Sequence, residues 1–462
     1  MQYVDVLIIG SGQAGAPLSW RLARAGRSVV LAERGHLGGT CVNVGCTPTK
    51  TFIASAEAAH RARRAGELGV ETGDVHVDWA RVLDRKRDVV ETWRSGVAAN
   101  VEKAAPRLEL VRGHARFTGP RTVRIGDRAV TAETVIVNTG GRPRIPPIPG
   151  LSDVPYLDSS TVMDVPDLPA HLVVLGGGYI GCEFAQAFAR FGARVTVVET
   201  GDHLLGREDE DVSEALEEAL REEGVELRLG ARATGVEAVR AEGGDEVRVT
   251  VEGGVGPVTG SHLLVATGRR PNTDDLGCPA AGLELDEKGY VVVDDRYRTS
   301  ADGVYAVGDC TGGPQFTHAS WDDHRILFDL LHGIDRRTRA DRLVPHAVFT
   351  DPQVARVGLS EREAREQGRR VEVATMPFAR IARAYETDRA AGLVKVLVDP
   401  ETERLVGACV VGAEGAELVS VLQMLMAADA PASALVDAEM IHPSFAEGLQ
   451  TAVMRLERYQ LS

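Results

Sequence analysis

The chain has 462 residues, of which 44% are hydrophobic and 26% are charged, as in globular proteins that fold in water. Its length indicates about three domains. The formal net charge is −15 and there is no extended basic run, which argues against nucleic acid or an anionic membrane as the main partner.

The N-terminal residues run directly into an apolar strand without the features of a signal peptide, and no apolar segment reaches the length of a membrane span. We therefore expect a cytoplasmic protein. The six cysteines are too few and too scattered for a disulfide scaffold; they stand at positions 41, 46, 182, 278, 310 and 409. In a reducing compartment, a disulfide between two of them would be catalytic or regulatory rather than structural.

A short apolar strand over residues 4–9 is followed by Gly10, Gly12 and Gly15, by a predicted helix and by a second strand that ends on Glu33. In this context the glycines let the backbone approach a pyrophosphate at the start of the helix, and the acid can accept hydrogen bonds from a ribose. This stretch therefore predicts a dinucleotide-binding unit.

Two cysteines, Cys41 and Cys46, come next, with Lys50 shortly after them. Thr47 is predicted to cap a helix whose first turn contains Pro48, and thiols at a helix start favour the reactive thiolate. On a regular helix a five-residue offset sets side chains about 140° apart, so pairing the thiols requires the chain between them to leave helical geometry. The glycine before the second cysteine allows this. On spacing alone, two ordinary buried cysteines explain the pattern equally well.

The dinucleotide pattern occurs a second time. A strand over residues 171–175 leads into Gly176, Gly178 and Gly181, then into a predicted helix and a strand that ends on Glu199. The first glycine and the acid are 23 residues apart in both copies. Either two dinucleotides are bound, or one unit was duplicated and one site was lost.

Each unit ends in the same way, with an apolar strand followed by Thr-Gly. The first pair is Thr139 and Gly140, and the second is Thr267 and Gly268. A further strand ends in a polar turn at Asp309. An aspartate at this place can hold a sugar-like chain, although Gly-Asp turns are also common without any ligand. The first unit is therefore expected to resume after the second one.

The remaining segments have other patterns. Residues 51–105 predict long helices with a break near 66–77, and residues 225–262 alternate as in a small antiparallel insert. From about residue 343 onward, strands and a strongly apolar helix over 417–428 indicate an α+β domain with the composition of an interface.

Near the end of the chain His442 is followed by Glu447, and a histidine without context is most often structural. Together, the cysteine pair, the two glycine motifs, the Asp309 turn and this histidine resemble the pyridine nucleotide-disulfide oxidoreductases of the glutathione reductase and dihydrolipoamide dehydrogenase type. The resemblance covers essentially the whole chain. It implies an α/β fold class, with two Rossmann-like dinucleotide-binding domains and a C-terminal α+β dimerisation domain.

The resemblance also implies where each function lies. Residues 1–150 and 270–342 are expected to bind FAD, residues 151–269 to bind NAD(P), and residues 343–462 to form the interface of a homodimer. The implied FAD contacts are Gly10, Gly12, Gly15, Glu33, Thr40, Lys50, Ala115, Thr139, Gly140, Asp309 and Thr317. The implied nicotinamide nucleotide contacts are Gly176, Gly178, Tyr179, Ile180, Gly181, Glu199 and Gly268. Of these, Tyr179 is expected to gate the nicotinamide pocket.

The mechanism that the resemblance implies is a relay of electrons and protons. Hydride passes from the nicotinamide to one flavin face, and electrons leave the other face through Cys46 to open a Cys41–Cys46 disulfide. Cys41 then attacks the substrate. His442, oriented by Glu447 and supplied by the partner subunit, is expected to act as acid and base, so a homodimer is a condition for activity.

Charged residues bear on both cofactors. By the resemblance, Lys50 and Glu183 form an ion pair near the reactive flavin nitrogen. Glu199 is expected to bind a ribose diol and to repel a 2′-phosphate. No lysine or arginine that could bind such a phosphate follows it before Arg207. We therefore expect NADH to be favoured over NADPH.

The substrate is expected to be a low-molecular-weight disulfide. Residues 39–50 are also close to those of mercuric reductases, but the chain has no C-terminal cysteine pair and no N-terminal metal-carrier domain, and it keeps His442. Reduction of a metal ion, Hg(II) or Cu(II), or of a quinone is the alternative, and a redox sensor with negligible turnover is a third hypothesis.

No resident metal is expected. Residues 315–323 resemble a bacterial flavoprotein subgroup linked to oxidative stress and copper reduction, and three roles there stay open: those of His318, Asp322 and Asp323.

Overall fold

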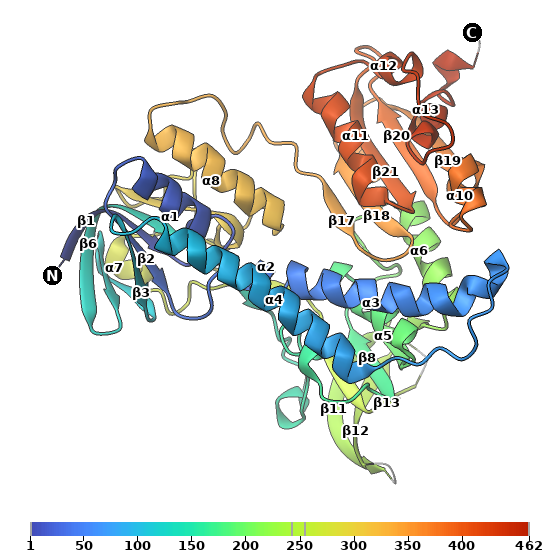
Figure 1. The fold of residues 1–462 in the computed structure, drawn as a ribbon, viewed down its shortest axis with the longest axis horizontal. Helices are drawn as coiled ribbons and strands as arrows, with labels where there is room; N and C mark the ends of the chain where they lie inside the picture. Colours follow the sequence, from blue (N-terminus) through green and yellow to red (C-terminus); the bar gives the residue numbers. More distant parts are fainter. Residues whose placement is uncertain (1, 242–243, 254–255, 461–462) are drawn as a thin grey trace. The chain divides into compact units, whose positions relative to one another are not determined.

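The structure is a computed structural model that describes residues 2–241, 244–253 and 256–460. It divides into two compact units, each with its own sheet of mainly parallel strands (Figure 1). Unit 1 comprises Met1–Phe52, Ala80–Arg144 and Gly268–Arg342. Unit 2 comprises Ile53–Trp79, Ile145–Thr267 and Leu343–Ser462, and it also contains a C-terminal antiparallel sheet. The predicted fold class, α/β with two Rossmann-like domains and a C-terminal α+β domain, is confirmed.

The sheet of unit 1 has the strand order β3-β2-β1-β6-β5-β4, with β16 beside β6. Its strands are β1 (Gln2–Ile9), β2 (Val29–Glu33), β3 (Leu108–Arg112), β4 (Ala115–Gly119), β5 (Thr122–Ile125), β6 (Arg128–Val137) and β16 (Val304–Ala306). Only β4 and β5 run antiparallel to their neighbours. Successive side chains of β1 enter different cores, because Ile8 packs with Leu18 and Leu327 whereas Leu7 packs with Phe117. Burial on both faces explains why this strand is a continuous apolar run.

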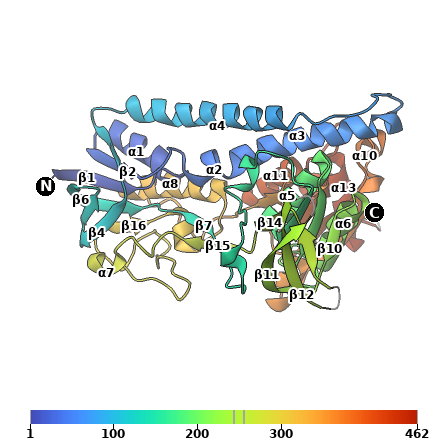
Figure 2. The ribbon, with the colours of Figure 1, turned by 90° about the horizontal axis from the view of Figure 1, so that it is seen from below.

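Helices α1 (Gly15–Arg24) and α8 (Thr317–Leu331) pack against each other in unit 1 (Figure 2). The predicted helices after the cysteines are α3 (Cys46–Arg64) and α4 (Trp79–Glu102), and the predicted break between them is confirmed. Unit 1 also contains the helices α2 (Gly39–Asn43) and α7 (Cys278–Ala281) and the antiparallel strand pair β7 (Gly141–Pro143) and β15 (Arg269–Pro271).

Unit 2 has a parallel sheet with the order β10-β9-β8-β14 and a separate antiparallel sheet. The parallel strands are β8 (His171–Leu175), β9 (Arg194–Val198), β10 (Glu226–Arg228) and β14 (His262–Val265), and the helices are α5 (Tyr179–Phe191) and α6 (Glu210–Glu222). The antiparallel strands are β11 (Arg232–Ala241), β12 (Gly244–Glu252) and β13 (Val258–Gly260). The prediction that the insert begins at residue 225 is wrong, because β10 follows α6 as the next strand of the parallel sheet.

The C-terminal sheet is antiparallel, in the order β17-β18-β21-β20-β19. Its strands are β17 (His346–Val348), β18 (Gln353–Gly358), β19 (Glu372–Pro377), β20 (Leu393–Val398) and β21 (Leu405–Gly412). Around it lie α9 (Glu361–Glu366), α10 (Ala382–Glu386), α11 (Gly415–Ala427), α12 (Ser433–Val436) and α13 (Glu447–Val453). The apolar helix α11 covers β18 and β21 (Figure 1). Among the described residues, no helix combines the length and the apolarity that crossing a lipid bilayer requires.

Candidate functional site

The cysteine segment is divided between two helices. Cys41 lies in α2, the chain then leaves helical geometry, and α3 begins at Cys46. A Cβ atom on Gly45 would lie 2.9 Å from the carbonyl oxygen of Thr40, closer than a real Cβ atom approaches backbone, so glycine is needed at this position. The predicted departure from helical geometry between the two cysteines is confirmed.

Neither cysteine is in a disulfide, and Cys41 is half-buried whereas Cys46 is exposed. The hydrogen bond with Cys46, together with burial, raises the pKa of Cys41 and outweighs the opposite effects of the Thr317 hydroxyl and the Thr47 amide. The reduced pair therefore keeps its proton on Cys41. The prediction that Thr47 caps the helix is wrong, because α3 already begins at the second cysteine and encloses Thr47 in its first turn.

A hydroxyl of a distant segment touches the thiol pair. Thr317 is the first residue of α8, and its Oγ1 atom lies 3.0 Å from Cys46 Sγ. Either atom can be the donor; when the sulfur is a thiolate, the hydroxyl must donate. The sequence indicated Thr317 only through the resemblance, and the structure brings it against the cysteines from 271 positions away.

The first glycine turn connects β1 to α1. Gly10 has φ +102°, and a Cβ atom on Gly15 would lie 2.0 Å from the Gly10 carbonyl oxygen, so both positions require glycine. The carboxylate of Glu33, at the end of β2, accepts hydrogen bonds from Ser11 N at 2.9 Å and from Gly35 N at 2.7 Å. The acid predicted to bind a ribose is thus held at the turn by backbone amides.

The second glycine turn, between β8 and α5, repeats this arrangement. Gly176 has φ +108°, and a Cβ atom on Gly181 would lie 1.9 Å from the Gly176 carbonyl oxygen. The carboxylate of Glu199, at the position that follows β9, accepts from Gly177 N at 2.5 Å and from Gly201 N at 2.7 Å. The equal spacing in sequence therefore corresponds to equal hydrogen bonding of the two acids.

Polar residues follow the parallel strands β6 and β16, which pair side by side and therefore end at one edge of the sheet. Thr139 follows β6, and its buried hydroxyl has no hydrogen-bond partner among the described residues. Asp309 follows β16; burial raises the pKa of its carboxyl, and Arg269 offsets this only in part. The carboxamide of Asn138 lies against the first glycine turn.

The structure gives Asp323 a structural role. Its buried carboxylate accepts hydrogen bonds from the Tyr297 hydroxyl at 2.9 Å and from Arg342 at 2.5 Å. The other oxygen accepts from Gly308 N at 2.7 Å, directly before Asp309. Asp323 therefore fixes the turn on which Asp309 stands.

The two other residues of that segment also have close neighbours. Asp322 accepts hydrogen bonds from Arg337 at 2.6 Å and from Arg325 at 3.2 Å. The ring of His318 stacks on Phe316, with centroids 5.5 Å apart. These contacts hold the start of α8, next to the threonine that touches the cysteines.

The charged pair predicted near the flavin comes from two helices. Lys50 lies one turn after Cys46 on the same side of α3. Glu183 is buried on α5 and accepts a hydrogen bond from Phe349 N at 2.9 Å. Their ion pair stays a prediction. The other predicted cofactor residues lie near the ends of elements, namely Thr40 in α2, Ala115 at the start of β4 and Ile180 in α5.

His442 and Glu447 form a pair, with 2.9 Å between Nδ1 and a carboxylate oxygen. Glu447 is the first residue of α13, and the imidazole is 71% exposed. A carboxylate on Nδ1 orients the ring and leaves Nε2 available for another group. The prediction that the two residues interact is confirmed, whereas the catalytic role stays a prediction.

Three residues around Tyr179 were not predicted from the sequence, because they belong to no motif and come from distant segments: Glu208, His346 and Arg356. The described residues contain no cluster of three or more His, Cys, Asp or Glu side chains that could hold a metal ion.

The residues present fit dinucleotide cofactors. Positions at which a Cβ atom would meet nothing within 4 Å lie at the turns and strand ends, namely Gly140, Gly178 and Gly268. The unpartnered hydroxyl of Thr139 is a polar atom that a bound ligand would satisfy. The amides and acids of the two glycine turns supply the donors and acceptors that a pyrophosphate and a ribose require.

Comparison with known proteins agrees with this chemistry. Residues 4–323 match the pyridine nucleotide-disulphide oxidoreductase family, and residues 344–453 match the dimerisation domain of the same family. RclA of Escherichia coli (strain K12), described as a probable pyridine nucleotide-disulfide oxidoreductase, is 37% identical over 457 residues, covering 97% of this chain and 98% of RclA. A mercuric reductase of Bacillus cereus is 32% identical over 457 residues, covering 98% of this chain and 72% of that protein.

Among solved structures, the chain is similar to a Cu(II) complex of RclA from Escherichia coli, described as an HOCl-induced flavoprotein disulfide reductase. The TM-score is 0.89 at 36% identity, and the match covers 98% of this chain and 99% of that one. The chain therefore belongs to the pyridine nucleotide-disulphide oxidoreductases, and it is a flavin-dependent enzyme that uses a pyridine nucleotide and acts on a sulfur group.

Proposed function

We propose that this enzyme is an FAD-dependent NADH:disulfide oxidoreductase that reduces a low-molecular-weight disulfide through a Cys41–Cys46 dithiol. The observation that carries the proposal is the contact between the two thiols at the break between α2 and α3, with the Thr317 hydroxyl 3.0 Å from Cys46. An inert pair of buried cysteines needs neither a glycine-dependent break nor an exposed sulfur.

The reaction balances as NADH + H⁺ + R–S–S–R′ giving NAD⁺ + RSH + R′SH. When bound, FAD supplies the two-electron step between the nicotinamide and the protein disulfide. Cys41 holds the proton of the reduced pair, and losing it makes this sulfur the attacking thiolate. A mixed disulfide with Cys41 forms as the first substrate thiol leaves, and Cys46 then displaces the second thiol by re-forming the internal disulfide.

We assign the proton transfers to His442, oriented by Glu447. The leaving substrate thiolate needs a proton, and an imidazolium group can donate it. His442 is exposed on a single chain and lies in the part that matches the dimerisation domain. Both facts support the proposal that the histidine serves the active site of a partner subunit in a homodimer.

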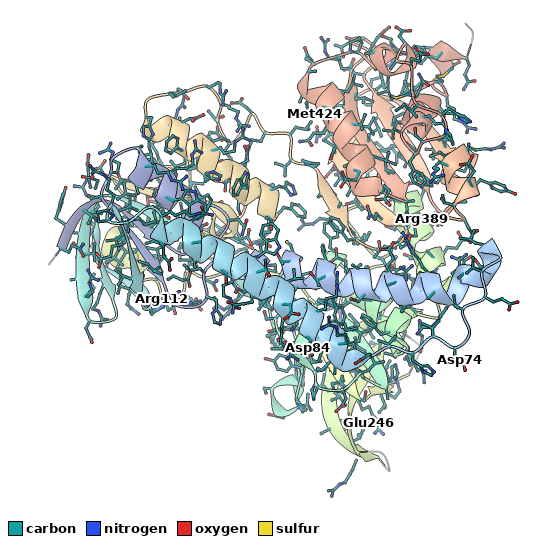
Figure 3. The ribbon with its side chains drawn as sticks, viewed as in Figure 1. Asp74, Asp84, Arg112, Glu246, Arg389 and Met424 are labelled. Atoms are coloured by element: carbon teal, nitrogen blue, oxygen red, sulfur yellow. The ribbon has the colours of Figure 1, made fainter. Side chains whose placement is uncertain are left out.

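The surface of the C-terminal sheet supports the same assembly. Residues 343–462 expose large apolar side chains, among them Met424, which projects from α11 and is 67% exposed, and Ile441, which is 81% exposed (Figure 3). Side chains of this kind favour a protein interface over water. We propose residues 343–462 as the dimerisation domain, residues 1–150 with 270–342 as the FAD domain, and residues 151–269 as the NAD(P) domain.

We propose NADH rather than NADPH as the reductant. Glu199 presents its carboxylate at the second glycine turn, where backbone amides hold it. There it can accept hydrogen bonds from the two hydroxyls of a ribose diol. A 2′-phosphate at the same place would meet this negative charge, and the first lysine or arginine after Glu199 in the sequence is Arg207.

Anaerobic titration with NADH tests the proposal on the purified enzyme and on its Cys41→Ser and Cys46→Ser variants. We expect a thiolate-to-flavin charge-transfer band that persists without Cys41 and is lost without Cys46. In His442→Ala, disulfide turnover should collapse while flavin reduction by NADH remains fast. Identical spectra for all three proteins would rule out the assignment of the cysteines.

Reduction of Cu(II) is a second candidate, because RclA, which is similar over almost the whole chain, was solved as a Cu(II) complex. In this candidate the ion would meet the thiolates of the dithiol. Steady-state rates with a panel of disulfides, Cu(II), Hg(II) and quinones separate the two candidates. Activity with Cu(II) that survives in His442→Ala would favour metal reduction, since no leaving thiol is protonated.

A further inference from the structure

The segment that carries His442 connects the helices α12 and α13 and has no helix or strand of its own. The two helices pack against each other in the C-terminal part of the chain (Figure 1). His442 and its neighbour Ile441 are both strongly exposed, so packing of these side chains does not fix the imidazole. The position of the histidine therefore depends on the contacts that hold the segment at its two ends.

Gln450 holds the beginning of this segment. Its Nε2 atom donates to the carbonyl oxygens of Leu435 and Val436, each at 3.0 Å, and to that of Ala438 at 2.6 Å. The first two belong to the last turn of α12, where carbonyl groups have no partner within the helix. Because all three neighbours are acceptors, the nitrogen of the amide must face them. Gln450 thus closes α12 and fixes the main chain four residues before His442.

Other contacts hold the end of the segment, after the histidine. The ring of Phe445 stacks on Phe378, with centroids 5.9 Å apart. The hydroxyl oxygen of Ser444 accepts a hydrogen bond from the backbone amide of Glu447 at 3.3 Å. The chain is therefore fixed on both sides of His442, by Gln450 before it and by these contacts after it.

Helix α13 carries both of the side chains that determine where the imidazole lies. Glu447 and Gln450 are three residues apart, so they lie on the same side of the helix. The carboxylate of Glu447 orients the ring through Nδ1 of His442, at 2.9 Å, whereas Gln450 sets the main chain that leads to the ring. Leu449 and Val453 are fully buried, so the helix that carries both side chains is itself fixed to the core.

We propose that Gln450 is a positioning residue for the acid–base histidine and that it acts through the carbonyl groups that lead into the segment of His442. The inference rests on the proposed function, in which His442 gives a proton to the leaving thiolate. Such a proton transfer depends steeply on the placement of the donor. Because Gln450 acts only through His442, its loss should slow protonation of the leaving thiol and leave flavin reduction by NADH unchanged.

Steady-state turnover of two disulfides by the holoenzyme tests this proposal. The alkyl disulfide of mercaptoethanol releases a basic thiolate that needs a proton, whereas the aryl disulfide of thionitrobenzoate releases a thiolate that is stable without one. Gln450→Met keeps the length of the side chain and removes the donors, so we expect its kcat for the alkyl disulfide to fall about tenfold and its kcat for the aryl disulfide to stay unchanged. Gln450→Lys offers donors to the same carbonyl groups and should restore most of the lost rate.

Gln460→Met is the matched control, because Gln460 Nε2 also donates to a backbone carbonyl oxygen, that of Arg455, at 2.6 Å. It should change neither rate. Gln450→Met should cause no further loss in a His442→Ala background, since the two residues act in one step. Equal losses with both disulfides, or a further loss in that background, would overturn the proposal, because a general loosening of the fold would cause them; so would an unchanged rate in Gln450→Met. A His442→Ala enzyme that reduces the alkyl disulfide at the wild-type rate would instead overturn the acid–base role in the proposed function.

Discussion

Replacing Thr317 with valine tests how the protein stabilises the reactive sulfur. The substitution preserves the shape of the side chain and removes the hydroxyl that lies 3.0 Å from Cys46 Sγ. A hydrogen bond to a charged group contributes about 1.5–3 kcal/mol, and because Cys46 is exposed we take the lower end of this range. Since one pKa unit corresponds to about 1.4 kcal/mol, the apparent pKa of the reduced pair should rise by about one unit.

The assay is the thiolate-to-flavin charge-transfer absorbance of the two-electron-reduced enzyme, recorded as a function of pH. We expect the midpoint of Thr317→Val to lie above that of the wild type, which means that less thiolate is present at neutral pH. Thr299→Val serves as the control, because the Thr299 hydroxyl donates to a backbone oxygen, that of Val304, at 2.8 Å. An unshifted midpoint in Thr317→Val would refute the reasoning, as would an equal shift in the control.

Three further predictions concern the turn, the second acid and a buried histidine. Gly45→Ala places a Cβ atom 2.9 Å from backbone and should lower stability by about 1–3 kcal/mol and slow dithiol formation, whereas Gly66→Ala, with open space at Cβ, should do neither. Glu199→Gln should raise kcat/KM for NADPH relative to NADH by about tenfold, measured in steady state, and an unchanged ratio would remove the acid from cofactor selection. Burial lowers the pKa of His324 to about 4 from an ordinary value of 6.5. As the pH falls, the histidine of the unfolded chain therefore binds a proton before that of the folded chain does. The free energy of unfolding should decrease by up to about 3 kcal/mol between pH 6.5 and pH 4. His324→Leu should lose this part of the pH dependence in thermal unfolding, and a curve parallel to the wild type would contradict the assignment.

The sequence was sufficient for the elements whose determinants are local. The glycine turns and the acids Glu33 and Glu199 could be placed because a strand, a turn and a helix of fixed length determine where the next strand ends. The same reasoning predicted the break between Cys41 and Cys46, since a regular helix cannot bring the two thiols together. It gave the wrong helix start at Thr47, because local propensity does not decide between adjacent first residues.

Long-range contacts could not be predicted from the sequence. Glu208 meets His346 across 138 positions and Arg356 across 148, and neither distance leaves a periodic or motif signal. In the sequence Glu208 stands in an acidic run that has the composition of a solvated surface, yet in the structure it is among the most buried carboxylates. The strand β10 was not predicted because a sequence pattern of three residues is too short to indicate a strand. Its assignment depends on the parallel pairing with β9, which is a long-range contact.

The ion pair between Arg342 and Asp323 has a mechanical consequence. Arg342 is the last residue of unit 1, and its guanidinium is fastened to the carboxylate that also holds Gly308 N. The last residue of unit 1 and the turn that carries Asp309 are therefore held by one carboxylate. Loss of that carboxylate would release both of them at once.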